Sequence, residues 1–137
     1  METAKILVVE DDADINGLLT AILKKQGYEV TSAFSGSEAG LCLQNGTYQL
    51  VLLDLMLPGI TGETLIEQIR GEYTMPILVI SAKGQEDKLK VLRMGADDFI
   101  SKPFDVEEVI ARVQAQLRRY TQFSIHKQEA GKLRFKQ

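Results

Sequence analysis

Five side chains that can bind a metal or a phosphate follow short apolar segments of this sequence. Glu10 and Asp11 come after one such segment, Asp54 after another, and Ser81 and Lys102 after two more. Carboxylates bind hard divalent cations, whereas a hydroxyl and an ammonium group bind the oxygens of a phosphoryl group. If the fold brings these side chains together, the sequence predicts phosphate chemistry supported by a cation.

The cation expected at such a cluster is Mg²⁺. Asp12 adds a further carboxylate beside Glu10 and Asp11, and carboxylates in one shallow site repel one another unless a cation balances them. Cys42 is the only cysteine and His126 the only histidine, so disulfide bonds, Cys/His zinc sites and Ser-His or Cys-His nucleophile pairs are not expected. Mg²⁺ prefers oxygen ligands and commonly takes one or two carboxylates together with a phosphate.

Each of these residues also has an ordinary structural interpretation. Acidic residues stabilise a helix N-terminus, a serine after a strand usually serves a turn, and Lys102 can simply be solvated. Asp54 is different, because it follows four apolar residues, Leu50–Leu53, and a buried carboxylate is costly unless it is paired or bound to a metal. Asp54 is therefore the strongest candidate for a functional role, as a nucleophile toward a metal-polarised phosphoryl group.

The segments that must position these residues alternate between strand and helix patterns. Short β-branched apolar runs are typical of strands buried on both faces, and apolar residues that recur every three or four positions predict helices. Strands are predicted at 5–9, 28–33, 50–53, 76–80 and 99–100. Helices are predicted at 15–23, 35–45, 61–70, 86–94 and 106–120.

This alternation predicts an α/β fold with a doubly wound parallel sheet. Each crossover between parallel strands needs a helix and turns right-handed, so helices cover both faces of the sheet. Ligands of such sheets bind beyond the carboxyl ends of the strands, where all the candidate residues lie. The chain has 137 residues, of which 45% are hydrophobic and 26% charged, as expected for one domain with a packed core.

Charge and hydropathy limit the partners that are expected. Residues 121–137 carry +3, because four basic residues oppose Glu129, and residues 1–120 carry −6, which together give the net charge of −3. An acidic body binds nucleic acid poorly. The longest apolar stretch is too short for a membrane span and no secretion signal is visible, so a cytoplasmic protein is expected. The domain is predicted at 1–120 and a linker or tail at 121–137.

Five motifs resemble the receiver domain of two-component response regulators. They lie within residues 4–120 and contain the candidate site residues. The motifs are Val8-Val9-Glu10-Asp11-Asp12, Leu53-Asp54-Leu55-Met56-Leu57-Pro58-Gly59, Ile80-Ser81-Ala82-Lys83, Gly95-Ala96-Asp97-Asp98-Phe99 and Ser101-Lys102-Pro103-Phe104. The resemblance implies a flavodoxin-like (βα)5 sheet with the strand order 2-1-3-4-5.

The resemblance also implies a metal site and a phosphoacceptor. Asp54 would accept a phosphoryl group from a sensor histidine kinase. Asp11, Asp54 and the backbone carbonyl of Met56 would bind Mg²⁺, with Glu10 acting through a water molecule. A protein of this kind is a signalling switch rather than an enzyme, although it catalyses its own phosphoryl transfer and a slow self-dephosphorylation.

The resemblance also implies a conformational switch that involves Ser81, Phe99 and Lys102. Ser81 and Lys102 would bind the phosphoryl group, and the bond between Lys102 and Pro103 would be cis. Phe99 would be the aromatic switch residue that turns inward when Ser81 moves. Phosphorylation would bias an existing two-state equilibrium, because these contacts are better in one of the two states.

The motifs Gly-Ala-Asp-Asp-Phe and Lys-Pro-Phe are most similar to the OmpR/PhoB-like branch, whose receivers precede a winged-helix DNA-binding domain. That branch usually has tyrosine and threonine where this chain has Phe99 and Ser81. Its members form homodimers on phosphorylation through the fourth helix, fifth strand and fifth helix, and they control transcription. The charged residues that this face would offer here are Lys88, Asp97, Asp98, Glu108, Arg112 and Arg119. DNA would be bound only through a domain that lies outside this chain, and residues 121–137 would lead toward it.

Three other functions are compatible with parts of the sequence. A flavodoxin-like module that binds a nucleotide or flavin would use the same edge, but the sequence has neither a G-x-G-x-x-G nor a G-x-x-x-x-G-K-[ST] loop, and the edge is acidic. A phosphatase with an aspartyl intermediate would usually carry a second acid two residues after Asp54, where this chain has Met56. The third is nucleic-acid contact by the basic residues of 121–137, although scattered cations are more typical of a solvated linker.

Overall fold

The five strands form one parallel sheet in the computed structural model, which describes the backbone of residues 3–136 and the side chains of residues 3–121. The strands are β1 (Lys5–Val9), β2 (Glu29–Ala33), β3 (Leu50–Leu53), β4 (Ile77–Ser81) and β5 (Asp98–Ser101). Their order in the sheet is β2-β1-β3-β4-β5, and every neighbouring pair is parallel. The doubly wound α/β fold and the strand order expected from the sequence are confirmed.

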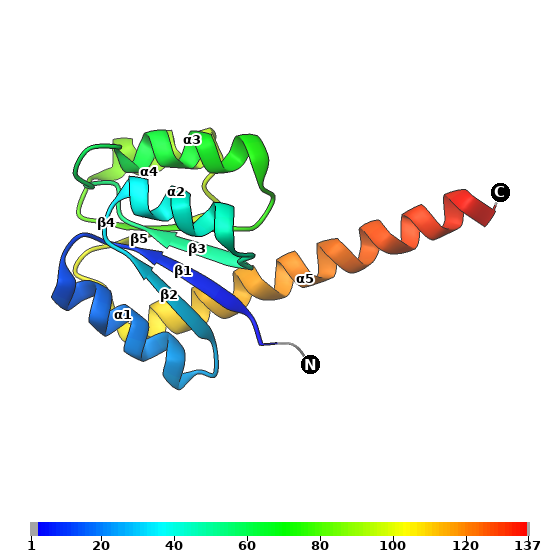
Figure 1. Ribbon diagram of the computed structural model, residues 1–137, viewed down its shortest axis with the longest axis horizontal. Helices are drawn as coiled ribbons and strands as arrows, with labels where there is room; N and C mark the ends of the chain where they lie inside the picture. The colour runs from blue at the N-terminus through cyan, green and yellow to red at the C-terminus, as the bar shows by residue number, and fades with distance from the viewer. Residues whose placement is uncertain (1–2, 137) are drawn as a thin grey trace.

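Five helices cover the two faces of the sheet (Figure 1). They are α1 (Ala13–Lys25), α2 (Gly36–Asn45), α3 (Gly62–Glu72), α4 (Gln85–Met94) and α5 (Val106–Lys136). The helices α1 and α5 lie on one face, and α2, α3 and α4 lie on the other. The chain after β1 and the chain after β3 therefore leave toward opposite faces although the two strands are neighbours. In doubly wound sheets, ligands bind at such a divergence, beyond the carboxyl ends of the strands.

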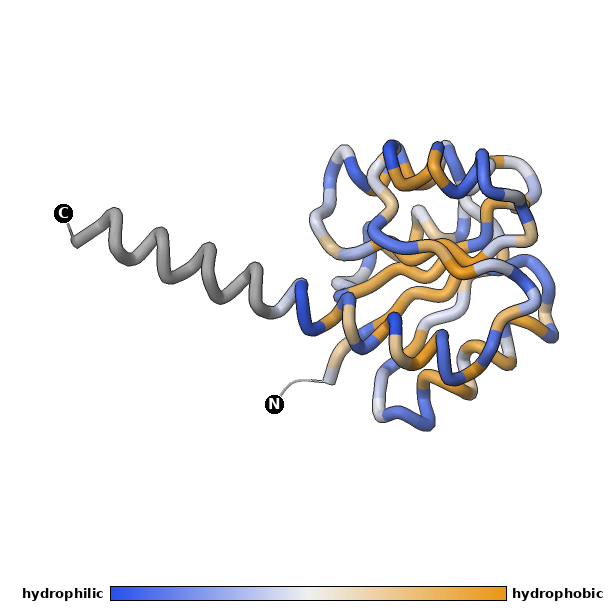
Figure 2. The backbone as a smooth tube through the Cα atoms, turned by 180° about the vertical axis from the view of Figure 1, so that it is seen from behind, coloured by the Kyte–Doolittle hydropathy of each residue, from blue (hydrophilic) through white to orange (hydrophobic). Residues whose placement is uncertain are grey.

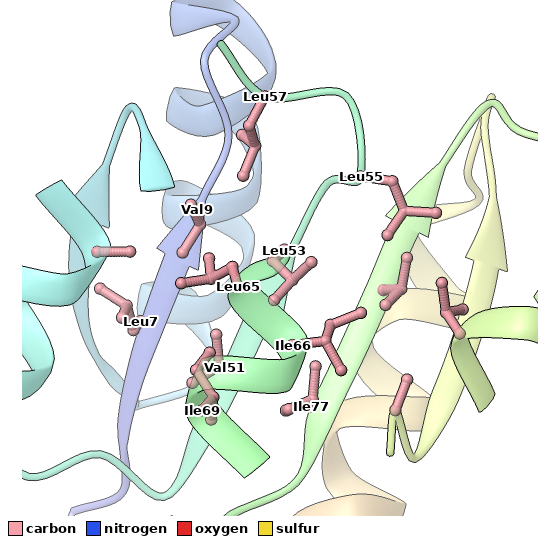
Figure 3. Packing of buried hydrophobic residues seen from close by; sticks show 14 of the residues in the cluster. Leu7, Val9, Val51, Leu53, Leu55, Leu57, Leu65, Ile66, Ile69 and Ile77 are labelled. Carbon is pink, nitrogen blue, oxygen red and sulfur yellow. The ribbon is translucent and has the colours of Figure 1, made fainter. Parts of the chain in front are cut away.

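Each face of the sheet has its own hydrophobic core. Figure 2 shows hydrophobic strands at the centre, between helices of alternating polarity. On one face, Leu65, Ile66 and Ile69 of α3 pack toward Val51 and Leu53 of β3 (Figure 3). On the other face, α1 and α5 cover a second cluster of buried side chains. All four residues of β3 are buried, so the chain enters the loop after β3 from the interior of the protein.

Side chains cap the first three helices at their N-termini. The Asp12 carboxylate accepts a hydrogen bond from Ile15 N at 3.0 Å, and Ser35 and Thr61 cap α2 and α3 in the same way. Such caps satisfy backbone N–H groups that have no partner within the helix. The Asp12 cap also fixes the chain directly after the acidic pair at the end of β1.

Gly62 allows α3 to start against the loop that follows β3. A Cβ atom at this position would lie 2.4 Å from Leu55 Cα and 2.6 Å from Asp54 O. These are backbone atoms, so only glycine permits the approach without a shift of the chain. The start of α3 and the loop that carries Asp54 are thereby held together.

The element boundaries lie close to the predicted ones, with one exception. The sequence predicts that the last helix ends near Tyr120, whereas α5 continues to Lys136. Residues 121–136 contain no proline and many residues of favourable helix propensity, which explains why the missing apolar period does not end the helix. The side chains of 122–137 lie outside the described residues, so the division into a domain at 1–120 and a tail at 121–137 stays a prediction. Within residues 3–136, no helix combines the length and apolarity needed to span a bilayer.

Candidate functional site

The register of the strands brings the predicted site residues to one edge of the sheet. Val9 of β1 pairs with Leu53 of β3, and Leu53 pairs with Val79 of β4. The ladder continues one step further, because Asp54 N donates a hydrogen bond to Val9 O at 3.0 Å. The residues that follow β1 and β3 and the end of β4 therefore lie side by side.

Lys102 connects the acidic residues that follow β1 and β3. Its Nζ atom donates to Glu10 Oε1 at 2.6 Å and to Asp54 Oδ2 at 2.7 Å. The side chains of Glu10 and Asp54 are only 3% and 8% exposed, and that of Lys102 is 17% exposed. The peptide bond between Lys102 and Pro103 is cis, as the resemblance implies. Two buried carboxyl groups thus share a single cationic side chain.

Burial and charge act in opposite directions on this group. Burial raises the pKa of Glu10 above its usual 4.5, and the charge of Asp54 adds to the rise, although hydrogen bonds from Lys102 and from Asp12 N oppose it. Burial lowers the pKa of Lys102, but the hydrogen bonds and charges of Asp54 and Glu10 outweigh burial and raise that pKa above 10.5. Lys102 therefore carries its positive charge at neutral pH.

Three acidic residues at this edge are arranged in a way that suits a divalent cation. One carboxylate oxygen from each of Glu10, Asp11 and Asp54 lies within 4.8 Å of the other two. Asp11 is exposed, so this side of the cluster is open to solvent, and the three acids outnumber the one ammonium group of Lys102. An all-oxygen set with an open side fits Mg²⁺, which keeps several of its waters.

The remaining predicted site residues are Met56, Ser81 and Phe99, and of these only Met56 forms a hydrogen bond with Asp54. Met56 N donates to Asp54 Oδ1 at 3.1 Å, and the Met56 side chain is 60% exposed. Ser81 is fully buried at the end of β4, where its hydroxyl accepts a hydrogen bond from Lys83 N at 3.4 Å. Within the described part of the chain, Ser81 makes no hydrogen bond to Asp54. Phe99 on β5 is buried in the core beside α2, α3 and α4, and so its ring faces inward.

A groove of about 620 Å³ opens beside Glu10, Asp11 and Asp54, which together form the acidic edge of the sheet. Its lining includes Asp11, Met56, Lys83 and Lys90. Glu63 forms part of the wall, where Lys83 Nζ donates to Glu63 Oε2 at 3.1 Å, while Glu63 Oε1 is buried without a hydrogen-bond partner among the described residues. The groove leaves space for a phosphate-bearing group to approach the acidic edge from solvent.

Three of the charged residues that the resemblance assigns to a dimer face pair with one another inside this chain. Arg112 Nη1 lies 3.0 Å from Asp98 Oδ1, and Arg112 Nε lies 3.1 Å from Glu108 Oε2. The carboxylates of Asp98 and Glu108 raise the pKa of the Arg112 guanidinium. Pairing within one chain does not require a partner subunit, and the assignment of these residues to a dimer face stays a prediction.

Arg70, which the sequence analysis did not single out, holds another residue of that face. Its Nη2 atom donates to Asp97 Oδ2 at 2.9 Å and to Gly95 O at 2.8 Å, so it joins α3 to the turn between α4 and β5. Lys88 and Arg119 form no ion pair among residues 3–121. The face therefore offers two unpaired cations beside several internal pairs.

Asn16, a fully buried polar residue behind Glu10, was not predicted from the sequence. A signal was present in the sequence, because Asn16 lies on the same side of α1 as Leu19 and Leu23, three and seven positions later, which are both buried. A polar side chain on the buried stripe of a helix needs hydrogen-bond partners in the interior.

Comparison with known proteins places the fold and the site in a family. The model of the response regulator receiver domain matches residues 6–114. The chain belongs to the response regulator receiver domain family. The match includes the residues that carry the acidic edge, the Ser81 hydroxyl and the Lys102 amine. This receiver domain is thus part of a two-component signalling system.

Two curated relatives and one solved structure illustrate the similarity of this receiver domain to known proteins. It is 45% identical to regulatory protein VanR of Enterococcus faecium, over 88% of this chain and 52% of VanR. It is 43% identical to the uncharacterized transcriptional regulatory protein YcbL of Bacillus subtilis, over 93% of this chain and 57% of YcbL. The chain spans about half the length of these relatives. The BeF3-activated receiver domain of Klebsiella pneumoniae RstA has a TM-score of 0.80 and 35% identity, over 83% of this chain and 98% of that one.

Proposed function

We propose that this receiver domain is a switch that accepts a phosphoryl group on Asp54 from a sensor histidine kinase. The observation that carries the proposal is the contact of Lys102 Nζ with both Asp54 and Glu10, at the edge where Asp11 adds a third acid. A carboxylate nucleophile, a fixed positive charge and open access through the groove are the features that phosphoryl transfer to a side chain requires.

The transfer itself would use the carboxylate of Asp54. An oxygen of Asp54 forms the new bond to phosphorus, the phosphorus–nitrogen bond of the phosphohistidine breaks, and the imidazole nitrogen keeps the electron pair. Met56 N, which donates to Asp54 Oδ1, orients the carboxylate for this attack. Asp11, Asp54 and the Met56 carbonyl would hold Mg²⁺ directly and Glu10 through water. When bound, this cation neutralises charge on the phosphoryl oxygens.

The switch would follow from what Lys102 and Ser81 do once the phosphoryl group is present. Lys102 would turn from the Asp54 carboxylate to a phosphoryl oxygen, and the Ser81 hydroxyl would leave its contact with Lys83 N to donate to another oxygen. Phe99, whose ring is already buried before Ser81 moves, would shift further toward the space that Ser81 vacates. A shift from about 1:99 to 99:1 needs roughly 5.5 kcal/mol of preference for one state, which several charge-assisted hydrogen bonds and dimerisation together can supply.

Dimerisation and a transcriptional output complete the proposed function. The charged face of α4, β5 and α5 would form the homodimer interface, and its internal pairs would exchange partners there. Such an exchange is inexpensive, because partly exposed ion pairs contribute only about 0–1 kcal/mol each. VanR and YcbL are regulatory proteins, which supports an output of this kind. DNA binding would belong to another domain, and the protein would act in the cytoplasm and slowly remove its own phosphoryl group.

Substitution of Asp54 tests the proposal directly. The wild-type protein, Asp54→Ala and the control Asp87→Ala are incubated with Mg²⁺ and a small phosphodonor, and the phosphoprotein is measured by intact mass. We expect the mass of one phosphoryl group to appear on the wild type and on Asp87→Ala, whose carboxylate lies on α4, but not on Asp54→Ala. Undiminished labelling of Asp54→Ala would contradict the proposal. A flavin absorbance spectrum in the purified protein would instead support the flavodoxin-like alternative.

A further inference from the structure

Asn16 lies directly behind the acidic edge. Its side chain is 1% exposed, and it belongs to the first turns of α1. The two N–H groups of its amide donate to two strand-end carbonyls, Glu10 O at 3.0 Å and Ala33 O at 3.2 Å. The amide oxygen accepts a hydrogen bond from Thr20 Oγ1 at 3.2 Å. Every polar group of this buried amide is therefore used.

The orientation of the amide is determined by its neighbours. Glu10 O and Ala33 O can only accept hydrogen bonds, so the NH₂ group of Asn16 must face them. The amide oxygen then faces the Thr20 hydroxyl on the other side. Thr20 Oγ1 in turn lies 3.0 Å from Ser32 Oγ of β2, so the network continues into the sheet. Satisfied buried networks of this kind hold their members in one arrangement.

The network holds the chain at Glu10 and Asp11, the first two carboxylates of the cation site. Among the described residues, Asn16 Nδ2 is the only hydrogen-bond donor to Glu10 O. The peptide unit that joins Glu10 to Asp11 is therefore oriented by Asn16. On the far side of Asp11, the chain is anchored twice more, because Asp12 N donates to Glu10 Oε2 and the Asp12 carboxylate caps α1. The Asp11 side chain leaves from a segment that is fixed at both ends.

We propose that Asn16 is a positioning residue that sets the Mg²⁺ affinity of the acidic edge by orienting the Glu10–Asp11 peptide unit. The proposal rests on the proposed function and deepens it by assigning part of the affinity to a residue that touches neither metal nor phosphate. Groups that orient ligands from behind typically change metal affinity 10–100-fold when they are removed. Asn16 acts through the backbone, so we expect an effect near the lower end of that range.

The test is the Mg²⁺ dissociation constant of the phosphate-free protein, measured by titration calorimetry. Leucine resembles asparagine in size but donates no hydrogen bond, so we expect Asn16→Leu to raise the dissociation constant on the order of tenfold. With a small phosphodonor, the Mg²⁺ concentration for half-maximal labelling should rise by the same factor. The labelling rate at saturating Mg²⁺ should stay close to that of the wild type, because Asp54 and Lys102 are unchanged.

A merely structural role for Asn16 is separated from positioning by a matched control. Ile69→Val and Ile69→Ala remove buried apolar atoms from the C-terminal end of α3, away from the acidic edge. The first should lower the unfolding free energy slightly and the second more strongly, so they show what destabilisation alone does to Mg²⁺ binding. We expect both to keep the wild-type Mg²⁺ affinity. If Asn16→Leu does not fold, Thr20→Val replaces it in the test. This change removes only the hydroxyl that orients the Asn16 amide, and we expect the Mg²⁺ dissociation constant to rise about threefold.

The outcomes distinguish the two proposals. If the wild-type protein binds no Mg²⁺, the proposed function fails together with the role of Asn16. If the wild type binds Mg²⁺ and is labelled, but the folded Asn16 or Thr20 variant keeps the wild-type dissociation constant, the positioning role alone is wrong. A rise of the constant in the Ile69 variants equal to that in the Asn16 variant would also overturn it, because general destabilisation would then explain the effect.

Discussion

Replacement of Lys102 by methionine removes the charge that the acidic edge shares. Methionine keeps much of the length and apolar character of lysine, but Glu10 Oε1 and Asp54 Oδ2 lose a partner that lies 2.6 and 2.7 Å away. These two carboxyl side chains are only 3% and 8% exposed, so water replaces the lost partner poorly. Removal of one member of a buried ion pair costs about 3–5 kcal/mol of unfolding free energy.

Protonation of Glu10 limits this cost and makes it depend on pH. Burial already raises the pKa of Glu10 above 4.5, and loss of the Lys102 charge raises it further. A group with a raised pKa in the folded state stabilises the fold below its unfolded pKa, and this stability is lost as the pH rises. The variant should therefore lose about 3 kcal/mol at pH 7, near the lower end of the range for a broken buried ion pair, and less at pH 5, where more of the Glu10 carboxyl is protonated.

Urea unfolding followed by far-UV circular dichroism, in EDTA at both pH values, measures these losses. The control is Lys5→Met, the same substitution in an exposed pair, because Lys5 Nζ lies 3.8 Å from Glu29 and the side chains are 54% and 62% exposed. We expect the control to lose less than about 0.5 kcal/mol at either pH. A loss below about 1 kcal/mol for Lys102→Met at pH 7, or equal losses at both pH values, would refute the argument.

Two further predictions concern other parts of the chain. Gly62→Ala should lower the unfolding free energy by at least about 2 kcal/mol, because the new Cβ would meet Leu55 Cα at 2.4 Å. Gly40→Ala, in open space within α2, should instead raise the unfolding free energy by about 0.5–1 kcal/mol. Chemical denaturation of both variants checks this, and similar effects of the two changes would contradict it. Burial and the nearby Glu38 charge raise the pKa of the Cys42 thiol above 9.0. Ellman's reagent should therefore react more slowly with the folded than with the urea-unfolded protein at pH 7.5. It should react faster with folded Glu38→Gln than with the folded wild type, because that variant lacks the Glu38 charge. Equal rates for the folded and unfolded chains would show that the thiol is not shielded.

The strands and the position of Asp54 were predictable because their signals are local. Leu50–Leu53 is a short continuous apolar run, which is typical of a strand covered on both faces. The carboxylate that follows must then stand at the edge of the sheet. The same reasoning placed the ends of β1 and β4, and the observed order of the strands agrees with the topology that the motifs imply.

Contacts between distant residues were only partly predictable. The sequence predicts that Lys102 neutralises a phosphoryl group, but it does not reveal that Lys102 binds Glu10, which is 92 residues away, when no phosphate is present. The choice of Asp98 as a partner of Arg112 also depends on how α5 crosses β5, whereas Glu108 lies four residues before Arg112 on the same helix. The end of α5 was misjudged, because the loss of an apolar period does not end a helix whose residues favour helical backbone.

The alternation of strands and helices, the acidic character of the edge and the residue types available for chemistry follow from the sequence alone. These properties depend on local periodicity and on the burial that it requires. The folded chain is needed to show which groups share the charge of Lys102 and which buried amide contacts the acidic pair. Such contacts depend on strand register and on the crossing of helices over the sheet, which join residues that no local pattern connects.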